Sequence, residues 1–184
     1  MCVGTGGGGD IEYHLMAVNE AEKLRQIDRS EVVDDIYYFR SGKLVLEKEH
    51  YDMRGFPPGE LDNIIERQKI LIYDGGTLMG AFHGGELVAA ASLENKFRGK
   101  QKKCMKMDIL FVSRPYRGRG IARRLVGMIG DLARERGADA LYISATPSKH
   151  TVEFYMGCGA KLVEELDAEL YGMEPEDIHL ELVL

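Results

Sequence analysis

The chain has few cysteines and no apolar run long enough to span a bilayer. Its three cysteines, Cys2, Cys104 and Cys158, form no CxxC pair and leave an odd number, which favours a reducing compartment over a disulfide framework. The longest apolar run, residues 87–93, is far shorter than the roughly 20 residues of a transmembrane helix. Residues 1–10 lack the basic and apolar regions of a secretory signal. We therefore expect a cytoplasmic protein, without a membrane partner, whose Gly-rich segment 1–10 is a disordered tail.

The net charge of −6 argues against a general nucleic-acid-binding protein. Arginines nevertheless gather in residues 114–124, so the positive charge of this acidic chain is concentrated in one segment. The acidic residues near the C-terminus are explained by a solvated surface, although they could also attract a cationic substrate. The length of 184 residues suits one domain, which we place at residues 11–184.

Apolar periodicity predicts an α/β fold with a mixed sheet. Strands are expected at residues 11–16, 77–83, 87–94, 104–112, 141–144, 161–166 and 178–184. Helices are expected after Asn19, after Pro58, at 119–136 and at 148–157. A further helix beginning at Ser30 is expected because Val32, Val33, Ile36 and Tyr37 lie at helical spacing. Residues 43–51 alternate as an edge strand or a lid hairpin does, and two glycines inside the long helix, Gly127 and Gly130, indicate close packing there.

The most informative segment is residues 108–124, DILFVSRPYRGRGIARR. An apolar strand pattern ends at Val112, and a loop containing Gly118 and Gly120 opens directly into a helix pattern. Glycine lets the backbone approach a ligand closely, and the free N–H groups and dipole of a helix N-terminus favour an anion. The segment predicts a site for a phosphate-bearing ligand.

Two familiar nucleotide-binding motifs do not fit this loop. The dinucleotide motif G-x-G-x-x-G needs a third glycine where this chain has Arg123. The P-loop motif needs G-K-[ST], which does not follow. A different pattern matches: Arg117, Gly120 and Ala122 form R-x-x-G-x-A, which resembles the [QR]-x-x-G-x-[GA] motif of the GNAT family of N-acetyltransferases.

A second landmark strengthens the resemblance to the GNAT family. Residues 148–159, SKHTVEFYMGCG, are similar to the family pattern N-x-x-A-x-x-F-Y-x-x-x-G. Phe154, Tyr155 and Gly159 match, whereas Ser148 replaces Asn and Thr151 replaces Ala. The resemblance covers residues 77–184 well and the N-terminal third only loosely. It implies a single-domain GNAT-like fold in which helices flank a mixed, mostly antiparallel sheet splayed between its fourth and fifth strands.

The resemblance also implies acetyl-CoA as the cofactor. The loop backbone would hold the coenzyme A pyrophosphate, pantetheine would lie between the diverging strands, and an N–H near Val112 would face the thioester carbonyl, where developing negative charge needs a donor. Ser148 departs from the family Asn, and its hydroxyl is expected to cap the helix instead. The cofactor-binding residues are then Leu110, Phe111, Val112, Arg117, Gly118, Arg119, Gly120, Ile121, Ala122, Ser148 and Thr151.

Three side chains are candidates for the chemistry. The resemblance places Tyr155 opposite the coenzyme sulfur, where a phenol can protonate the departing thiolate; the alternative is a core aromatic packed with Val152. Asp108 is a candidate base at a strand position that is often acidic in the family, or simply a satisfied strand carboxylate. Glu94 is a second candidate base.

The five histidines show no ligand spacing such as HxxxH, so we expect no catalytic metal. His150 is expected to be solvent-exposed or to cap a helix. Cys158 has no His at a recognisable partner spacing, so a small buried thiol and direct transfer are favoured over an acyl-enzyme.

The sequence thus predicts transfer of an acetyl group from acetyl-CoA to a primary amine by direct attack. The identity of the acceptor, a small molecule or a peptide, is left open. Whether the protein forms a homodimer is left open as well. The alternative is a non-catalytic acyl-CoA-binding or sensing module of the same fold.

Overall fold

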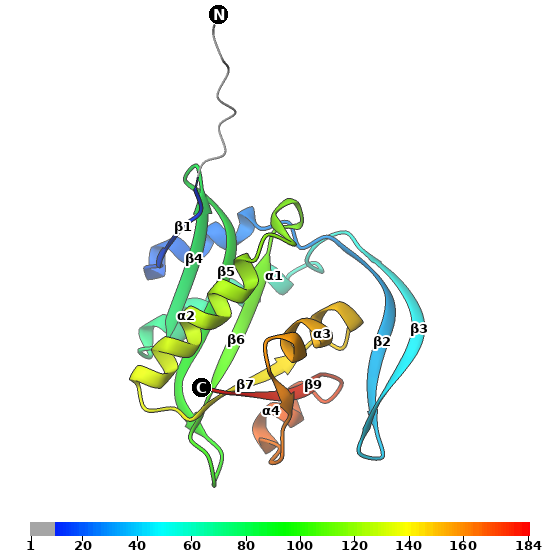
Figure 1. Cartoon of the computed structure of the whole chain (residues 1–184). Coiled ribbons are helices and arrows are strands. Elements are labelled where there is room, and N and C mark those ends of the chain that lie inside the picture. The colour runs from blue at the N-terminus through cyan, green and yellow to red at the C-terminus, as the bar shows by residue number, and fades with distance from the viewer. Residues whose placement is uncertain (1–9) are drawn as a thin grey trace, which may run out of the picture.

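The computed structural model describes residues 10–184, so most of the expected tail, residues 1–10, and Cys2 lie outside the described residues. A seven-stranded sheet forms the centre of the molecule (Figure 1). Its strands, in spatial order, are β1 (Glu12–Leu15), β4 (Thr77–His83), β5 (Glu86–Arg98), β6 (Cys104–Val112), β7 (Ala140–Ala145), β9 (Ile178–Val183) and β8 (Lys161–Leu162). All neighbours are antiparallel except the parallel pair β6 and β7.

The sheet opens between its fourth and fifth strands, β6 and β7, as expected. Cys104, Met105 and Lys106 pair with the first residues of β7, and the later residues of β6 have no partner strand on that side. On the other side of β6, a β-bulge places both Asp108 and Ile109 opposite Ser92 of β5. The gap between β6 and β7 beyond Lys106 positions the candidate functional site.

Helices cover both faces of the sheet (Figure 1). The α2 helix (Ile121–Glu135) buries Leu125, Ile129 and Ala133, spaced three or four residues apart, against one face. It ends before Gly137, whose φ of 89° suits glycine and confirms the expected stop. The 3₁₀ helix η1 (Val18–Gln26) and α1 (Glu60–Tyr73) cover the other face, and the shorter α3 (Lys149–Gly157) packs beside β7.

The expected helix from Ser30 is wrong. Residues 31–40 form strand β2 (Glu31–Arg40), which pairs with β3 (Lys43–Met53) in a separate two-stranded ribbon beside α3 (Figure 1). An isolated bridge between Ile36 and Ser148 and a 2.7 Å hydrogen bond from Tyr37 N to Pro147 O attach the ribbon to the start of α3. The edge strand or lid hairpin expected at 43–51 is strand β3, the second strand of this ribbon.

Three smaller expectations change. Strand β5 continues to Arg98, beyond the expected end at residue 94, and β8 ends at Leu162 instead of residue 166. A short helix, α4 (Ala168–Met173), was not expected; the Asp167 carboxylate caps it by accepting from Leu170 N at 3.0 Å. The helix expected after Asn19 is the 3₁₀ helix η1, which begins at Val18; its cap is Ala17, whose N–H donates to Glu20 Oε2 at 3.1 Å.

The two glycines inside α2 differ in their surroundings. A Cβ on Gly130 would lie 2.9 Å from Leu184 Cδ2, as close packing predicts, whereas a Cβ on Gly127 meets no atom within 4 Å. We expect Gly127→Ala to raise the free energy of unfolding by about 1 kcal/mol, since alanine favours the helix without a clash. Urea unfolding checks this, with Gly130→Ala as the comparison; an equal gain at both positions would contradict the difference in packing.

Candidate functional site

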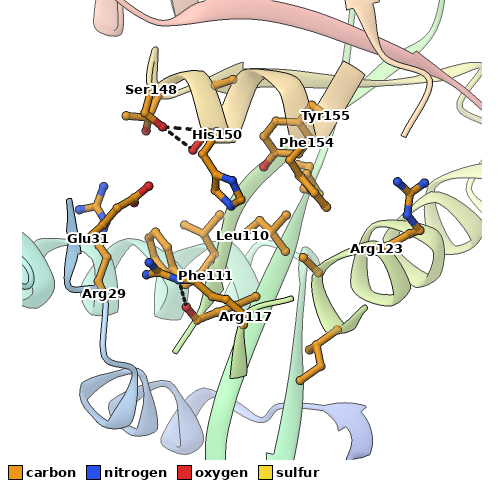
Figure 2. A pocket seen from close by; sticks show the side chains of 18 of the residues that line it. Arg29, Glu31, Leu110, Phe111, Arg117, Arg123, Ser148, His150, Phe154 and Tyr155 are labelled. Carbon is orange, nitrogen blue, oxygen red and sulfur yellow. Dashed lines mark hydrogen bonds between the residues drawn. The ribbon is translucent and has the colours of Figure 1, made fainter. Parts of the chain in front are cut away.

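A cavity of about 390 Å³ opens where β6 and β7 diverge. Residues from the end of β6, the following loop, the start of α2, the end of β7 and α3 line it, and Figure 2 shows their side chains converging on one space. Every expected coenzyme residue except Arg119 lines this cavity: Leu110, Phe111, Val112, Arg117, Gly118, Gly120, Ile121, Ala122, Ser148 and Thr151. Two stretches of sequence about 30 residues apart therefore meet, as the two landmarks predicted.

The backbone of β6 presents unpaired donors to the gap. Ser113 N–H donates to Val88 O at 2.8 Å and Ile109 N–H donates to Ser92 Oγ at 3.3 Å, so both point toward β5. Because backbone groups alternate in direction along a strand, the N–H groups of Leu110 and Val112 face the gap instead. A ligand lying along this edge can accept hydrogen bonds from them.

The glycine loop continues the site into the N-terminus of α2. Gly118 and Gly120 have φ values of 74° and 79°, the left-handed region that glycine adopts at little cost. The first helical hydrogen bond runs from Arg124 N to Gly120 O at 3.0 Å, so the N–H groups of Ile121, Ala122 and Arg123 have no acceptor within the helix. This arrangement fits an anion, and the helix dipole adds to the attraction.

The two arginines of this loop have different roles. The Arg117 guanidinium donates to Val112 O at 3.0 Å and to Ser30 O at 3.1 Å, so it fastens the loop to the end of β6 and to the segment before β2. The Arg119 guanidinium lies 5.1 Å from the Tyr116 ring centroid and is exposed. Arg117 is therefore a structural residue, and Arg119 keeps its charge available to solvent and ligand.

We expect Arg117→Ala to lower the free energy of unfolding by about 2 kcal/mol, because two carbonyls lose a charged donor. Arg119→Ala, the matched control, should cost less than about 1 kcal/mol, the value of an exposed cation–π contact. Urea denaturation with unchanged m-values tests both. Equal stability of the two variants would contradict the structural role of Arg117.

Helix α3 supplies the opposite wall of the cavity. Ser148 caps it as expected: its hydroxyl accepts from Thr151 N at 3.4 Å and donates to Thr151 Oγ1 at 2.9 Å (Figure 2). Tyr155 lies two turns along and lines the cavity, and its hydroxyl has no hydrogen-bond partner among residues 10–184. Burial, reinforced by the charges of Cys158 and Asp177, raises the pKa of Tyr155, so the phenol stays protonated.

Asp108 lines the cavity, but other groups surround its carboxylate. It accepts from Gln68 Nε2 at 2.6 Å and Arg67 Nε at 3.0 Å, and it pairs with Lys106 Nζ at 3.1 Å. Burial alone would raise the pKa of Asp108, but the charges of Lys106 and Arg67 and these hydrogen bonds hold it below its usual value. Such a carboxylate is a weak base, so the geometry favours the alternative of a satisfied strand carboxylate.

The other residues considered for the chemistry lie in different parts of the fold. Glu94 does not line the cavity; it pairs with Arg98 Nη2 at 2.7 Å at the other end of β5. His150 lines the cavity and is exposed, as expected. Cys158, expected to be buried, is only partly so, at the end of α3. Burial raises the pKa of the Cys158 thiol, which disfavours the thiolate that a nucleophile needs.

No motif indicated that the ribbon forms one wall of the cavity. Arg29, Glu31, Val33 and Met53 line the cavity from β2, β3 and the segment before them. The Arg29 guanidinium lies 5.5 Å from the Phe111 ring centroid and donates to Glu60 at 2.7 Å. These residues belong to no motif, and only their aromatic and β-branched neighbours in β2 could have indicated a strand here.

Within residues 10–184, no helix is long and apolar enough to cross a membrane. The same described residues hold no group of three or more His, Cys, Asp and Glu side chains arranged to bind a metal ion.

Solved structures with a similar fold are acetyltransferases. A nourseothricin acetyltransferase is 21% identical, with 94% of this chain and 98% of that chain covered and a TM-score of 0.67. A Bacillus anthracis protein assigned as a streptothricin acetyltransferase, in complex with acetyl coenzyme A, is 16% identical over 95% and 99%, with a TM-score of 0.70. The PaiA N-acetyltransferase of Thermoplasma acidophilum, in complex with coenzyme A, is 15% identical over 95% and 99%, with a TM-score of 0.62.

No curated protein matches the sequence. The model of the acetyltransferase (GNAT) family matches residues 44–160, from the ribbon to the end of α3. This match spans more than half of the chain and includes both landmarks, the Arg117–Ala122 loop and the 148–159 segment. The chain belongs to the acetyltransferase (GNAT) family.

Proposed function

We propose that this protein transfers the acetyl group of acetyl-CoA directly to an amine of a small molecule or peptide. One observation carries the proposal: a single cavity combines an unpaired strand edge, a glycine loop at a helix N-terminus, and the free hydroxyl of Tyr155. Each of these three features would bind a different part of acetyl-CoA. The features follow one another along the cavity in the order of those parts in the molecule. The coenzyme bound by two similar structures supports the same choice.

The glycine loop suits the pyrophosphate of the donor. The free N–H groups at the start of α2 and the positive φ of Gly118 and Gly120 give close access to the backbone. The exposed guanidiniums of Arg119 and Arg123 can add positive charge at the rim. Pantetheine would then lie along β6 and receive hydrogen bonds from the strand edge that β7 leaves free.

The thioester would lie between Val112 and Tyr155. The N–H of Val112 is a fixed donor, and such a donor stabilises the oxyanion that forms when an amine attacks the carbonyl carbon. The phenol of Tyr155 can protonate the thiolate that leaves, because its raised pKa keeps it protonated until a stronger base is generated nearby. Direct transfer follows, since the thiol of Cys158 lies at the far end of α3 and is not among the cavity-lining residues.

An amine panel tests the proposal. Purified protein is incubated with acetyl-CoA and polyamines, aminoglycosides, amino acids or peptides, and free thiol is measured. Amine-dependent thiol release with the expected mass of an N-acetyl product supports the function. Tight binding of coenzyme A, measured by calorimetry, with no release for any amine would instead indicate a non-catalytic acyl-CoA-binding module.

A further inference from the structure

We propose that Glu31 selects acceptors that carry a second positive charge, so that the substrate is an alkyl amine with an ammonium group at its far end. This inference rests on the proposed N-acetyltransfer. Glu31 belongs to neither landmark; it is the first residue of β2 and lines the cavity from the ribbon. In Figure 2 it lies at the opposite side of this space from Arg123, which belongs to the first turn of α2.

The segment before Glu31 is held against the end of β6. Asp28 N–H donates to Ser113 Oγ at 2.9 Å, and Asp28 O accepts from Arg114 N at 2.9 Å. Two hydrogen bonds in opposite directions fix the position of this segment. The ribbon therefore begins at the same end of β6 at which the proposed thioester would lie.

The Arg117 guanidinium brings Glu31 closer still. It donates to Val112 O at 3.0 Å and to Ser30 O at 3.1 Å. Because both oxygens share one guanidinium, they lie within about 9 Å of each other. Glu31 follows Ser30 directly, so its side chain starts within the length of a small molecule from Val112.

Glu31 gives the ribbon end of the cavity a free negative charge. Only two carboxylates, Glu31 and Asp108, are among the described residues that line the cavity. Lys106 and Arg67 pair with Asp108. The partly buried carboxylate of Glu31 has neither an ion pair nor a hydrogen-bond partner among residues 10–184. A cation from outside the chain can therefore pair with it.

The nearby guanidinium of Arg29 is already engaged. It donates to Glu60 Oε1 at 2.7 Å. It also lies 5.1 Å and 5.5 Å from the ring centroids of Phe56 and Phe111. These contacts hold the guanidinium at the Glu60 carboxylate and leave Glu31 available to a ligand.

Apolar side chains flank Glu31 on the same wall. Met53 is opposite Glu31 in the register of the ribbon, and Val33 follows two residues later on the same face of β2. Both line the cavity, and only 7% of Val33 is exposed. A methylene chain that lies along this wall removes its apolar surface from water. The wall therefore suits an alkyl chain that ends at a cation.

The carboxylate suits a nitrogen that does not react. A carboxylate beside an ammonium raises the pKa of that ammonium, whereas the attacking nitrogen must first lose its proton. Pairing with Glu31 would hold a reacting nitrogen in its inactive form. An acceptor with two amino groups avoids this conflict, since one end pairs with Glu31 while the other reaches the thioester between Val112 and Tyr155.

Acetylation of paired amines tests the proposal. The diaminoalkanes from diaminopropane to diaminohexane are each compared with the monoamine of the same chain length. For at least one diamine, the wild-type kcat/KM should exceed that of its monoamine by about 10- to 100-fold, the usual effect of one charged hydrogen bond. Glu31→Gln should remove most of this preference, mainly through KM, and leave the kcat/KM of the monoamine nearly unchanged.

Asp52→Asn is the matched control. Asp52 is exposed and pairs in register with Val32, so it lies on the other face of the ribbon. This variant loses the same charge outside the cavity and should keep the preference for diamines. Glu31→Gln should bind coenzyme A and unfold thermally as the wild type does, because its carboxylate has no partner to lose.

Glu31→Lys gives an independent answer because it reverses the charge. It should disfavour diamines and favour an amine with a carboxylate at its far end, such as aminopentanoate, over the monoamine. An equal loss for diamine and monoamine in Glu31→Gln, or a wild type that acetylates amines without favouring diamines, would overturn the role of Glu31 and leave N-acetyltransfer standing. A wild type that releases no thiol with any amine would overturn both.

Discussion

Tyr155→Phe is expected to lower the rate of acetyl transfer by about 10²- to 10⁴-fold, the usual contribution of a positioned acid. The hydroxyl has no hydrogen-bond partner among residues 10–184, so its removal breaks no structural contact. The ring remains packed among the buried residues around Val152. The variant should therefore bind coenzyme A as the wild type does and lose only the protonation of the thiolate.

Steady-state kinetics and calorimetry together test this expectation. Tyr37→Phe is the matched control, because it removes a phenol that donates to Glu153 at 3.2 Å on the outer side of the same helix. It should leave kcat nearly unchanged. If Tyr155→Phe kept the wild-type kcat, the acid role would be wrong and Tyr155 would be the core aromatic of the alternative interpretation.

Gly120→Asp is expected to weaken coenzyme A binding on the order of 100-fold, or about 2.7 kcal/mol. The φ of 79° at Gly120 strains a residue with a side chain, and a carboxylate at this position repels the pyrophosphate proposed to lie on the start of α2. A Cβ here meets no protein atom within 4 Å, so the fold should survive.

Gly137→Asp provides the control for the strain alone. Gly137 has a similar φ of 89° but follows the C-terminus of α2, and a Cβ there also meets no atom within 4 Å. Calorimetry should find wild-type affinity for coenzyme A in Gly137→Asp. This variant should lose at least as much thermal stability as Gly120→Asp, because a carboxylate is unfavourable at the C-terminus of a helix and favourable at its N-terminus. Equal affinities in the two variants would exclude the loop as the pyrophosphate site.

The sequence predicted best where local pattern and tertiary role agree. Strands β4 and β6 have the expected bounds, and α2 ends at the expected glycine, because alternation and helical periodicity are local properties. The glycine loop and α3 meet across the sheet opening because both follow central strands. For this reason the residues proposed to hold the coenzyme could be predicted from two short motifs.

The ribbon could not be predicted in the same way. In β2 the apolar residues Val32, Val33, Ile36 and Tyr37 fall at helical spacing by coincidence. Their strand conformation depends on pairing with β3 and on the contact of Ile36 with Ser148, more than 100 residues away. The β-branched and aromatic content of this segment favoured a strand, and the periodicity was the misleading signal.

The candidate bases show the same limit. A strand position indicated Asp108, but the partners that occupy its carboxylate, Arg67 and Gln68, come from a helix about 40 residues earlier. Motifs indicate the residues proposed to bind the donor, whereas the surroundings of a candidate base depend on the assembled fold.

A single-turnover experiment tests the central claim most directly. Enzyme in excess over acetyl-CoA is mixed with an accepting amine, and free thiol, N-acetyl product and the mass of the protein are measured over time. Direct transfer predicts that thiol and N-acetyl amine appear together at equal amounts, only when the amine is present, with no change in protein mass. Thiol release without amine accompanied by an acetylated protein, or bound acetyl-CoA that stays intact, would contradict the account.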